Sequence, residues 1–168
     1  IAEHLQAPVF CTNGSKGVLP EDHGLALGNL LSMSTILQEK VLAKSDLLLA
    51  LGTRFSQRAT KQWTLPMPGK IIHCDIDPEE FGRNYAPTAT VEGDSKIILQ
   101  GLINSLEESK IPKAADRTPE IQTLKAEAIE EMKGKQPEIF QAMEEIRRIL
   151  PRDAIVASQS IMGHWTRF

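Results

Sequence analysis

Two short apolar runs, each ending abruptly in small and charged residues, dominate the hydrophobic pattern of the chain. The first is Leu47–Leu51, followed by Gly-Thr-Arg, and the second is Ile71–Ile76, followed by Asp-Pro. Uninterrupted runs of this length are typical of strands that are buried on both faces of a parallel sheet. Shorter apolar segments predict two further strands, at Val9–Thr12 and Thr90–Glu92.

Apolar residues at helical spacing lie between and after these strands. The pattern predicts one helix from near residue 34 to about residue 44, and another that Asp94 caps and that runs to about residue 107. Asp77-Pro78-Glu79-Glu80 combines an acidic cap, a proline and a glutamate, which marks a further helix start. The alternation of strands and helices predicts a doubly wound α/β fold.

The composition of the chain changes after residue 108. Residues 110–117 read as a linker, helices are predicted to begin at Thr118 and Pro137, and Ala154–Ala157 is predicted to be a strand. Ile1–Leu5 is typical of the last turns of a helix, so we expect this chain to be a piece of a longer protein. The predicted parts are a first domain at residues 1–108, a linker with a helix at 109–136, and the start of a further domain at 137–168.

Polar and charged side chains gather where the two long strands end. Because ligands of parallel α/β sheets sit beyond the carboxyl ends of the strands, these side chains are expected to share one edge. An arginine fork matches phosphate oxygens, and a strand-end carboxylate can accept hydrogen bonds from ribose hydroxyls. The pattern therefore predicts a nucleotide site. Its members are Gly52, Arg54, Arg58, Asp75 and Asp77.

Each of these residues also has a purely structural interpretation. Gly52 can be a turn glycine that precedes two solvated arginines, and Asp75 can equally be a strand-end aspartate. A helix cap explains Asp77 better than a ligand contact does. Asp94 is predicted to cap its helix, with its side chain or the following amides meeting a ligand.

Composition narrows the classes of partner. The chain has 168 residues, of which 41% are hydrophobic and 24% charged, with a net charge of −3, and this balance argues against a nucleic-acid partner. No apolar run approaches the length of a membrane helix, and no signal peptide is visible. Cys11 and Cys74 are too few for a disulfide framework and are interpreted as reduced core residues of a cytoplasmic protein.

Neither a metal site nor a phosphate-binding loop of known pattern is predicted. The four histidines are dispersed, and His73 is expected to be packed within its strand. The loop at residues 13–17 lacks both the P-loop and the dinucleotide glycine patterns, so a plain connection between a strand and a helix is favoured.

Several segments, taken in order, resemble one family. They read Gly-Ser-Lys-Gly at 14–17, Leu-Pro-Glu-Asp-His at 19–23, Ser-Asp-Leu-Leu-Leu-Ala-Leu-Gly-Thr-Arg-Phe-Ser-Gln-Arg at 45–58, Lys-Ile-Ile-His-Cys-Asp-Ile-Asp-Pro-Glu-Glu-Phe-Gly at 70–82 and Val-Glu-Gly-Asp-Ser-Lys at 91–96. This series resembles the central domain of thiamine-diphosphate-dependent enzymes of the acetolactate synthase type. The tail of the chain is similar to the opening of the thiamine-diphosphate-binding C-terminal domain of that family.

The resemblance implies a Rossmann-like parallel sheet of six strands with flanking helices, truncated here at its N-terminal strand. In acetolactate synthases this domain binds FAD in a structural role, and in other members it binds ADP or nothing. The positions that match the flavin contacts are Gly52, Thr53, Arg54, Arg58, Asp75 and Asp94. No metal ligand is carried over, because Ser95 stands where the Gly-Asp-Gly metal motif has its second glycine.

The full-length parent is expected to be a transferase or lyase that decarboxylates 2-oxo acids and joins the product to an acceptor, with thiamine diphosphate and Mg²⁺. Its catalytic glutamate belongs to the first domain and its metal motif to the third, so no catalytic residue is expected in this fragment. The fragment alone is therefore expected to be inactive. Its expected partners are the missing N- and C-terminal domains and further copies of itself in a homo-oligomer, with no nucleic acid and no membrane.

The chain departs from the family pattern at three places, which keep alternatives open. A flavin-cradle stretch that the family writes Gly-Met-Leu-Gly-Met-His-Gly reads Gly-Asn-Leu-Leu-Ser-Met-Ser at 28–34. Ser56 and Gln57 replace two aspartates, and Ser158 and Ser160 replace an aspartate and a glycine. One alternative is a decarboxylase-type member whose central domain binds no nucleotide and only scaffolds subunit contacts. The other is a sirtuin-like nucleotide-dependent enzyme, which would need a catalytic histidine in its pocket and usually a zinc module.

Overall fold

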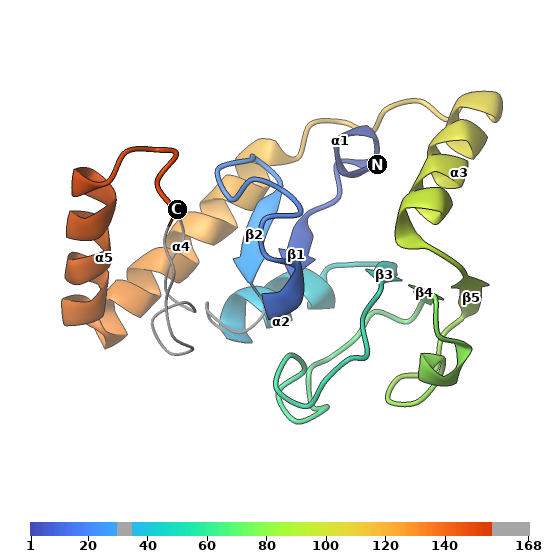
Figure 1. Cartoon of the computed structure of the whole chain (residues 1–168), viewed down its shortest axis with the longest axis horizontal. Helices are drawn as coiled ribbons and strands as arrows, with labels where there is room; N and C mark the ends of the chain where they lie inside the picture. Colours follow the sequence, from blue (N-terminus) through green and yellow to red (C-terminus); the bar gives the residue numbers. More distant parts are fainter. Residues whose placement is uncertain (30–34, 156–168) are drawn as a thin grey trace. The chain divides into compact units, whose positions relative to one another are not determined.

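The computed structural model describes residues 1–29 and 35–155, and the chain folds as two compact units (Figure 1). The sheet unit comprises residues 1–7 and 38–115. The helical unit comprises residues 8–37 and 116–168, within which the undescribed residues fall. Helix α2 (Thr35–Ala43) lies in the sequence where the chain passes from the helical unit to the sheet unit.

The sheet unit is built on three parallel strands in the order β3-β4-β5. They are β3 (Leu48–Leu51), β4 (Ile71–Asp75) and β5 (Ala89–Glu92). Ala50 and Ile71 from the first two strands pack with Phe55 in a buried apolar cluster, against which Leu48, Met67 and Tyr85 lie. The apolar runs therefore form strands because their side chains fill this core.

Helix α3 (Ser95–Glu108) follows β5 directly, contacts β4, and begins where the sequence predicts. The Asp94 carboxylate accepts hydrogen bonds from the backbone N–H groups of Lys96 and Ile97, which satisfies two donors of the first turn. The short helix α1 (Ala2–Leu5) is tied to the segment after α3, because Ala114 N donates to the His4 carbonyl at 2.8 Å.

The helical unit contains two parallel strands, β1 (Val9–Cys11) and β2 (Ala26–Asn29), joined through a short 3₁₀ turn η1 (Asn13–Ser15). It also contains helices α4 (Thr118–Lys135) and α5 (Pro137–Ile149). Gln122 and Lys125 of α4 donate hydrogen bonds to the carbonyls of Gly24 and Glu21, at 2.6 and 2.8 Å. These bonds hold α4 to the loop that precedes β2.

The structure confirms the predicted α/β class, with parallel sheets and flanking helices. The predicted strands near residues 9, 48, 71 and 90 and the helices starting near 35, 95, 118 and 137 all form. Residues 111–117 form neither helix nor strand, and their role as a linker stays a prediction. No described helix is long and apolar enough to cross a membrane. The domain boundaries at 108 and 136 stay predictions.

Four features of the secondary structure differ from the expectations or fall in part outside the described residues. Strand β2 was not predicted, and Asp77 caps a three-residue 3₁₀ turn, η2 (Pro78–Glu80), where a helix was expected. The described strands pair in two sheets, because β1 and β2 bond only to each other, so a single sheet of six strands is not seen within residues 1–29 and 35–155. Ala154 and Ile155 are not in a strand, and residues 156–157 lie outside the described residues.

Candidate functional site

The three strands of the sheet unit end together, as parallel strands must. Leu51 pairs with Cys74, and Asp75 pairs with Glu92. The ladder continues one residue past the strands, because Gly52 N donates to the Cys74 carbonyl at 2.8 Å and Gly93 N donates to the Asp75 carbonyl at 2.9 Å. We call this the carboxyl edge, defined by residues 52–54, 75–77 and 93–97. It brings the predicted residues Gly52, Asp75 and Asp94 to one side of the sheet.

Gly52 has a backbone conformation that favours glycine. Its φ is +56°, in the left-handed region, and the residue is exposed. A Cβ placed on it would meet only the Ser95 hydroxyl, at 3.6 Å. Gly52 therefore lies beside the first residue of α3, and its bare backbone leaves room at the carboxyl edge.

Arg54 and Arg58 are the cations that the sequence assigns to this site. Both are exposed, and neither guanidinium group makes a hydrogen bond or an ion pair with a residue in the described parts of the chain. An uncompensated guanidinium group in a loop after a strand end is suited to bind a phosphate oxygen pair. Thr53, between Gly52 and Arg54, is half-buried, and its hydroxyl accepts a hydrogen bond from Phe55 N at 3.3 Å.

The three aspartates at the carboxyl edge all serve local structure. Asp94 and Asp77 cap α3 and η2 through their carboxylates, which confirms the cap interpretation for both. Asp75 is buried, and one carboxylate oxygen accepts a hydrogen bond from Asp77 N at 3.0 Å. The other oxygen of Asp75 has no hydrogen-bond partner among the described residues. Contacts of these carboxylates with a ligand stay predictions.

Two apolar side chains at this edge were not predicted to matter. Ile76, directly after β4, is 72% exposed, and Ile97, in the first turn of α3, is 73% exposed. The hydrophobic pattern gave no signal for them, because Ile76 was counted as part of the buried strand. Exposed aliphatic side chains beside charged groups suit a ligand that has both a flat apolar ring and a charged part.

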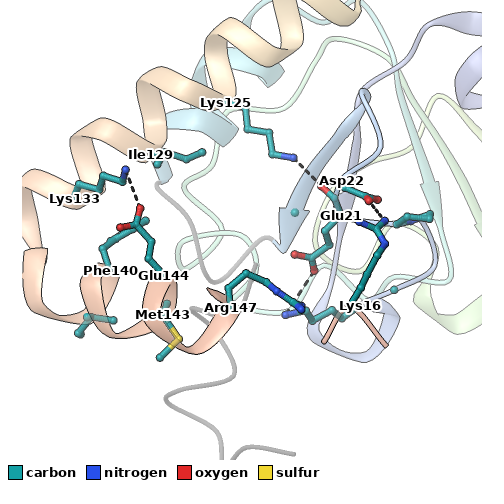
Figure 2. A pocket seen from close by; sticks show the side chains of 15 residues that line it. Lys16, Glu21, Asp22, Lys125, Ile129, Lys133, Phe140, Met143, Glu144 and Arg147 are labelled. Carbon is teal, nitrogen blue, oxygen red and sulfur yellow. Dashed lines mark hydrogen bonds and ion pairs between the residues drawn. The ribbon is translucent and has the colours of Figure 1, made fainter. Parts of the chain in front are cut away.

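A separate cavity of about 880 Å³ lies within the helical unit (Figure 2). Its lining combines an apolar wall from α4 and α5 with five basic residues: Lys16, Lys125, Lys133, Arg147 and Arg152. All five already have partners. Lys133 binds Glu144 at 3.0 Å, Arg152 binds Asp22, and Lys16 lies 3.6 Å from Glu21. Lys125 and Arg147 donate to backbone carbonyls.

Within the ion pairs of this cavity, one partner shifts the pKa of the other. The hydrogen bond that Asp22 accepts from Arg152 lowers the pKa of Asp22, and the hydrogen bond that Lys133 donates to Glu144 raises the pKa of Lys133. Because its charges are compensated internally, this cavity is a weaker candidate for an anionic ligand than the carboxyl edge and the loop that follows Gly52, where the guanidinium groups of Arg54 and Arg58 have no partner among the described residues.

Metal-binding and thiol chemistry receive no structural support in the described parts of the chain. No group of three His, Cys, Asp or Glu side chains among those residues is arranged to hold a metal ion. Cys11 and Cys74 are free and buried, which confirms their predicted place in the core. Burial raises the pKa of both thiols, so neither is a ready nucleophile.

Residues 1–102 match the family model described as "Thiamine pyrophosphate enzyme, central domain". The chain belongs to this family. It is 40% identical over 107 residues to a probable acetolactate synthase large subunit of Methanocaldococcus jannaschii, a match that covers 63% of this chain and 18% of the relative. It is 38% identical over 113 residues to an acetolactate synthase of Mycobacterium bovis, covering 67% and 18%. It is 40% identical over 110 residues to the chloroplastic acetolactate synthase 1 of Zea mays, covering 65% and 17%.

These matches establish the resemblance to thiamine-pyrophosphate-dependent enzymes of the acetolactate synthase type. The chain spans less than a fifth of the length of the curated relatives it matches. All six predicted site residues lie within the segment that matches the thiamine pyrophosphate enzyme central domain.

Only some of the positions at which the chain departs from the family pattern lie within the described residues. Gly28 and Asn29 form the end of β2, and the Asn29 amide donates to the Asn13 side chain. Residues 30–34, 158 and 160 lie outside the described residues. Ser56 stays within its own turn, since its hydroxyl accepts from Ala59 N and its carbonyl accepts from Thr60.

Proposed function

We propose that the carboxyl edge binds the diphosphate group of an adenine nucleotide, either FAD or ADP, in a structural role. The observation that carries this proposal is the pair of exposed guanidinium groups of Arg54 and Arg58, in the loop after Gly52, which have no partner within residues 1–29 and 35–155. Charge-assisted, bidentate bonds to phosphate are among the strongest that a surface loop can supply. The open backbone of Gly52 lets a diphosphate approach the start of α3 closely.

The remaining groups of the carboxyl edge suit the rest of such a ligand. The second carboxylate oxygen of Asp75 can accept a hydrogen bond from a ribose hydroxyl, and Ile76 and Ile97 offer apolar surface to a ring. The residues present therefore fit a nucleotide. Because Asp94 already caps α3 through two backbone N–H groups, its contribution would be to orient the helix start.

We further propose that the parent protein is a decarboxylase or carboligase acting on 2-oxo acids, of the transferase or lyase class. Thiamine diphosphate, held through Mg²⁺, would supply the carbanion chemistry in that protein. The groups that bind and activate it would come from domains of the same parent outside this chain. This chain would contribute a folded support, its bound nucleotide and contacts between copies of the parent.

The exposed strand β5 supports the contact role. All four of its residues are exposed, and it stands last in the order β3-β4-β5. An unpaired strand edge favours pairing with another chain or cover by another domain. A central domain that binds no nucleotide and only scaffolds such contacts is the second candidate function.

Separate titrations of FAD and ADP distinguish the two candidates. The wild-type chain should bind at least one of them in calorimetry, and Arg54→Ala should weaken binding by about tenfold, or roughly 1.4 kcal/mol. Arg148→Ala is the control, since Arg148 is also exposed but lies on α5 and pairs with Glu145. Binding of neither nucleotide, or an equal loss in the control, would contradict the nucleotide proposal and favour the scaffold.

The proposal that catalysis needs further domains has its own test. The chain supplied with thiamine diphosphate, Mg²⁺ and pyruvate should release no carbon dioxide above the background of the mixture without protein. Measurable turnover by this chain would contradict the proposal.

A further inference from the structure

Three consecutive backbone carbonyls in the loop after β3 each accept a side-chain hydrogen bond. The Thr53 carbonyl accepts from His73 Nε2 at 2.9 Å, the Arg54 carbonyl from Asn84 Nδ2 at 2.9 Å, and the Phe55 carbonyl from Trp63 Nε1 at 3.0 Å. The donors come from strand β4, from the loop after η2 and from the turn that follows Arg58. Three separate segments therefore converge on the main chain of the residues that carry Arg54.

His73 is the buried member of this set. Because a carbonyl can only accept, the proton of the neutral ring must lie on Nε2. The ring is 1% exposed and stands edge-on to Phe55 and Phe81, with centroids 5.2 Å away in both cases. Its Nδ1 atom has no hydrogen-bond partner, so the bond to Thr53 is the one polar contact that the buried ring makes among the described residues.

The held segment is conformationally constrained. Phe55 has a φ of +48°, in the left-handed region, which costs about 1–2 kcal/mol for a residue with a side chain. The burial of its ring in the core cluster and the Trp63 bond to its carbonyl offset that cost. Arg54 lies between Thr53 and Phe55, and all three backbone carbonyls are hydrogen-bonded. The main chain of Arg54 is therefore held in place, whereas its side chain is exposed.

We propose that His73, Asn84 and Trp63 are positioning residues, a carbonyl clamp that fixes the main chain of Arg54 for nucleotide binding. This inference rests on the proposed function of the carboxyl edge. An unclamped loop would have to be ordered when the ligand binds, and that ordering reduces affinity. With the clamp in place, the main chain of the loop is already ordered in the folded protein, so ligand binding has to immobilise only the Arg54 side chain.

Two variants remove one donor each and leave the core intact. Asn84→Ala acts on an exposed residue, and Trp63→Phe keeps an aromatic ring but lacks the N–H group. Asn104→Ala is the control, because Asn104 is also exposed and, among the described residues, its side chain accepts a hydrogen bond from Gln100 alone, on the same face of α3. Both clamp variants should lose about threefold to tenfold in affinity for ADP or FAD, with unchanged stoichiometry, and the control should lose none.

The rate of trypsin cleavage provides a second test of the clamp, and this test needs no ligand. Cleavage of the Arg54–Phe55 bond in the folded protein should become several-fold faster in both clamp variants, while cleavage after Lys113, in the irregular segment before α4, should keep its rate. Faster cleavage at both bonds would indicate general loss of stability and would overturn the positioning role. Unchanged cleavage at Arg54, or faster cleavage with unchanged affinity, would overturn it too.

The two proposals fail in different ways. A wild-type chain that binds neither nucleotide defeats the proposed function, and the trypsin comparison then still decides whether the clamp exists. A wild-type chain that binds nucleotide while the clamp variants bind equally well defeats the clamp alone.

Discussion

Replacing Gly52 with alanine tests the backbone geometry of the carboxyl edge. The φ of +56° places this residue where an L side chain is strained, and that strain amounts to about 1–2 kcal/mol. The new Cβ would lie 3.6 Å from the Ser95 hydroxyl, an ordinary contact, so no steric clash adds to the loss. Alanine also reduces the entropy of the unfolded chain, which by itself raises the free energy of unfolding by about 0.4–1 kcal/mol. The net decrease in the free energy of unfolding is therefore expected to be about 1 kcal/mol.

Urea unfolding followed by circular dichroism measures this decrease. Gly69→Ala is the matched control in the same unit, because its Cβ would meet nothing within 4 Å and its φ is outside the left-handed region. The control should be as stable as the wild type or slightly more stable. Gly52→Asn should recover part of the loss, since asparagine tolerates the left-handed conformation better than alanine. Equal stability of the Gly52→Ala and Gly69→Ala variants would refute the assigned backbone conformation.

Further predictions concern the core, the helix cap and the thiols. Ile121→Ala should lower the free energy of unfolding by about 2–5 kcal/mol in urea, because Ile121 is 1% exposed, whereas Ile149→Ala, at a 72% exposed position, should change it by less than about 0.5 kcal/mol. Asp94→Ala should cost about 1 kcal/mol in the same assay, and Asp94→Asn only a fraction of that, because asparagine also caps helices; equal losses would contradict the cap. Cys11 and Cys74 should resist Ellman's reagent at pH 8 until urea is added, because burial raises the pKa of both thiols and excludes the reagent; rapid reaction of the folded chain would show that the thiols are accessible.

Local signals explain the parts of the fold that were predicted. Strands β3 and β4 follow from apolar runs, and α3 follows from the cap at Asp94 and its apolar stripe. Strand β2 was missed because Ala26–Asn29 contains no β-branched or aromatic residue, so its local propensity for a strand is low. It forms because it pairs in parallel with β1, and pairing between distant segments leaves no local signature.

The candidate site likewise has features that local sequence predicted and features that depend on residues distant in the sequence. The positions of Gly52 and Asp75 at one edge followed from strand ends alone, and the cap of Asp94 followed from its neighbours. The carbonyl clamp could not be predicted, because His73 and Asn84 reach the loop from positions 20 and 30 residues further along the chain. That Arg54 and Arg58 have no partner in the described part of the chain likewise appears only when the surrounding side chains are placed.

The most direct test of the central claim is to map nucleotide binding on the ¹⁵N-labelled chain by NMR. When ADP is added, the account predicts that the largest amide shift changes occur at Gly52–Arg54 and Gly93–Asp94, on the carboxyl edge. Shift changes confined to the cavity of the helical unit, around Lys16 and Lys125, would contradict it, as would the absence of any change with either ADP or FAD.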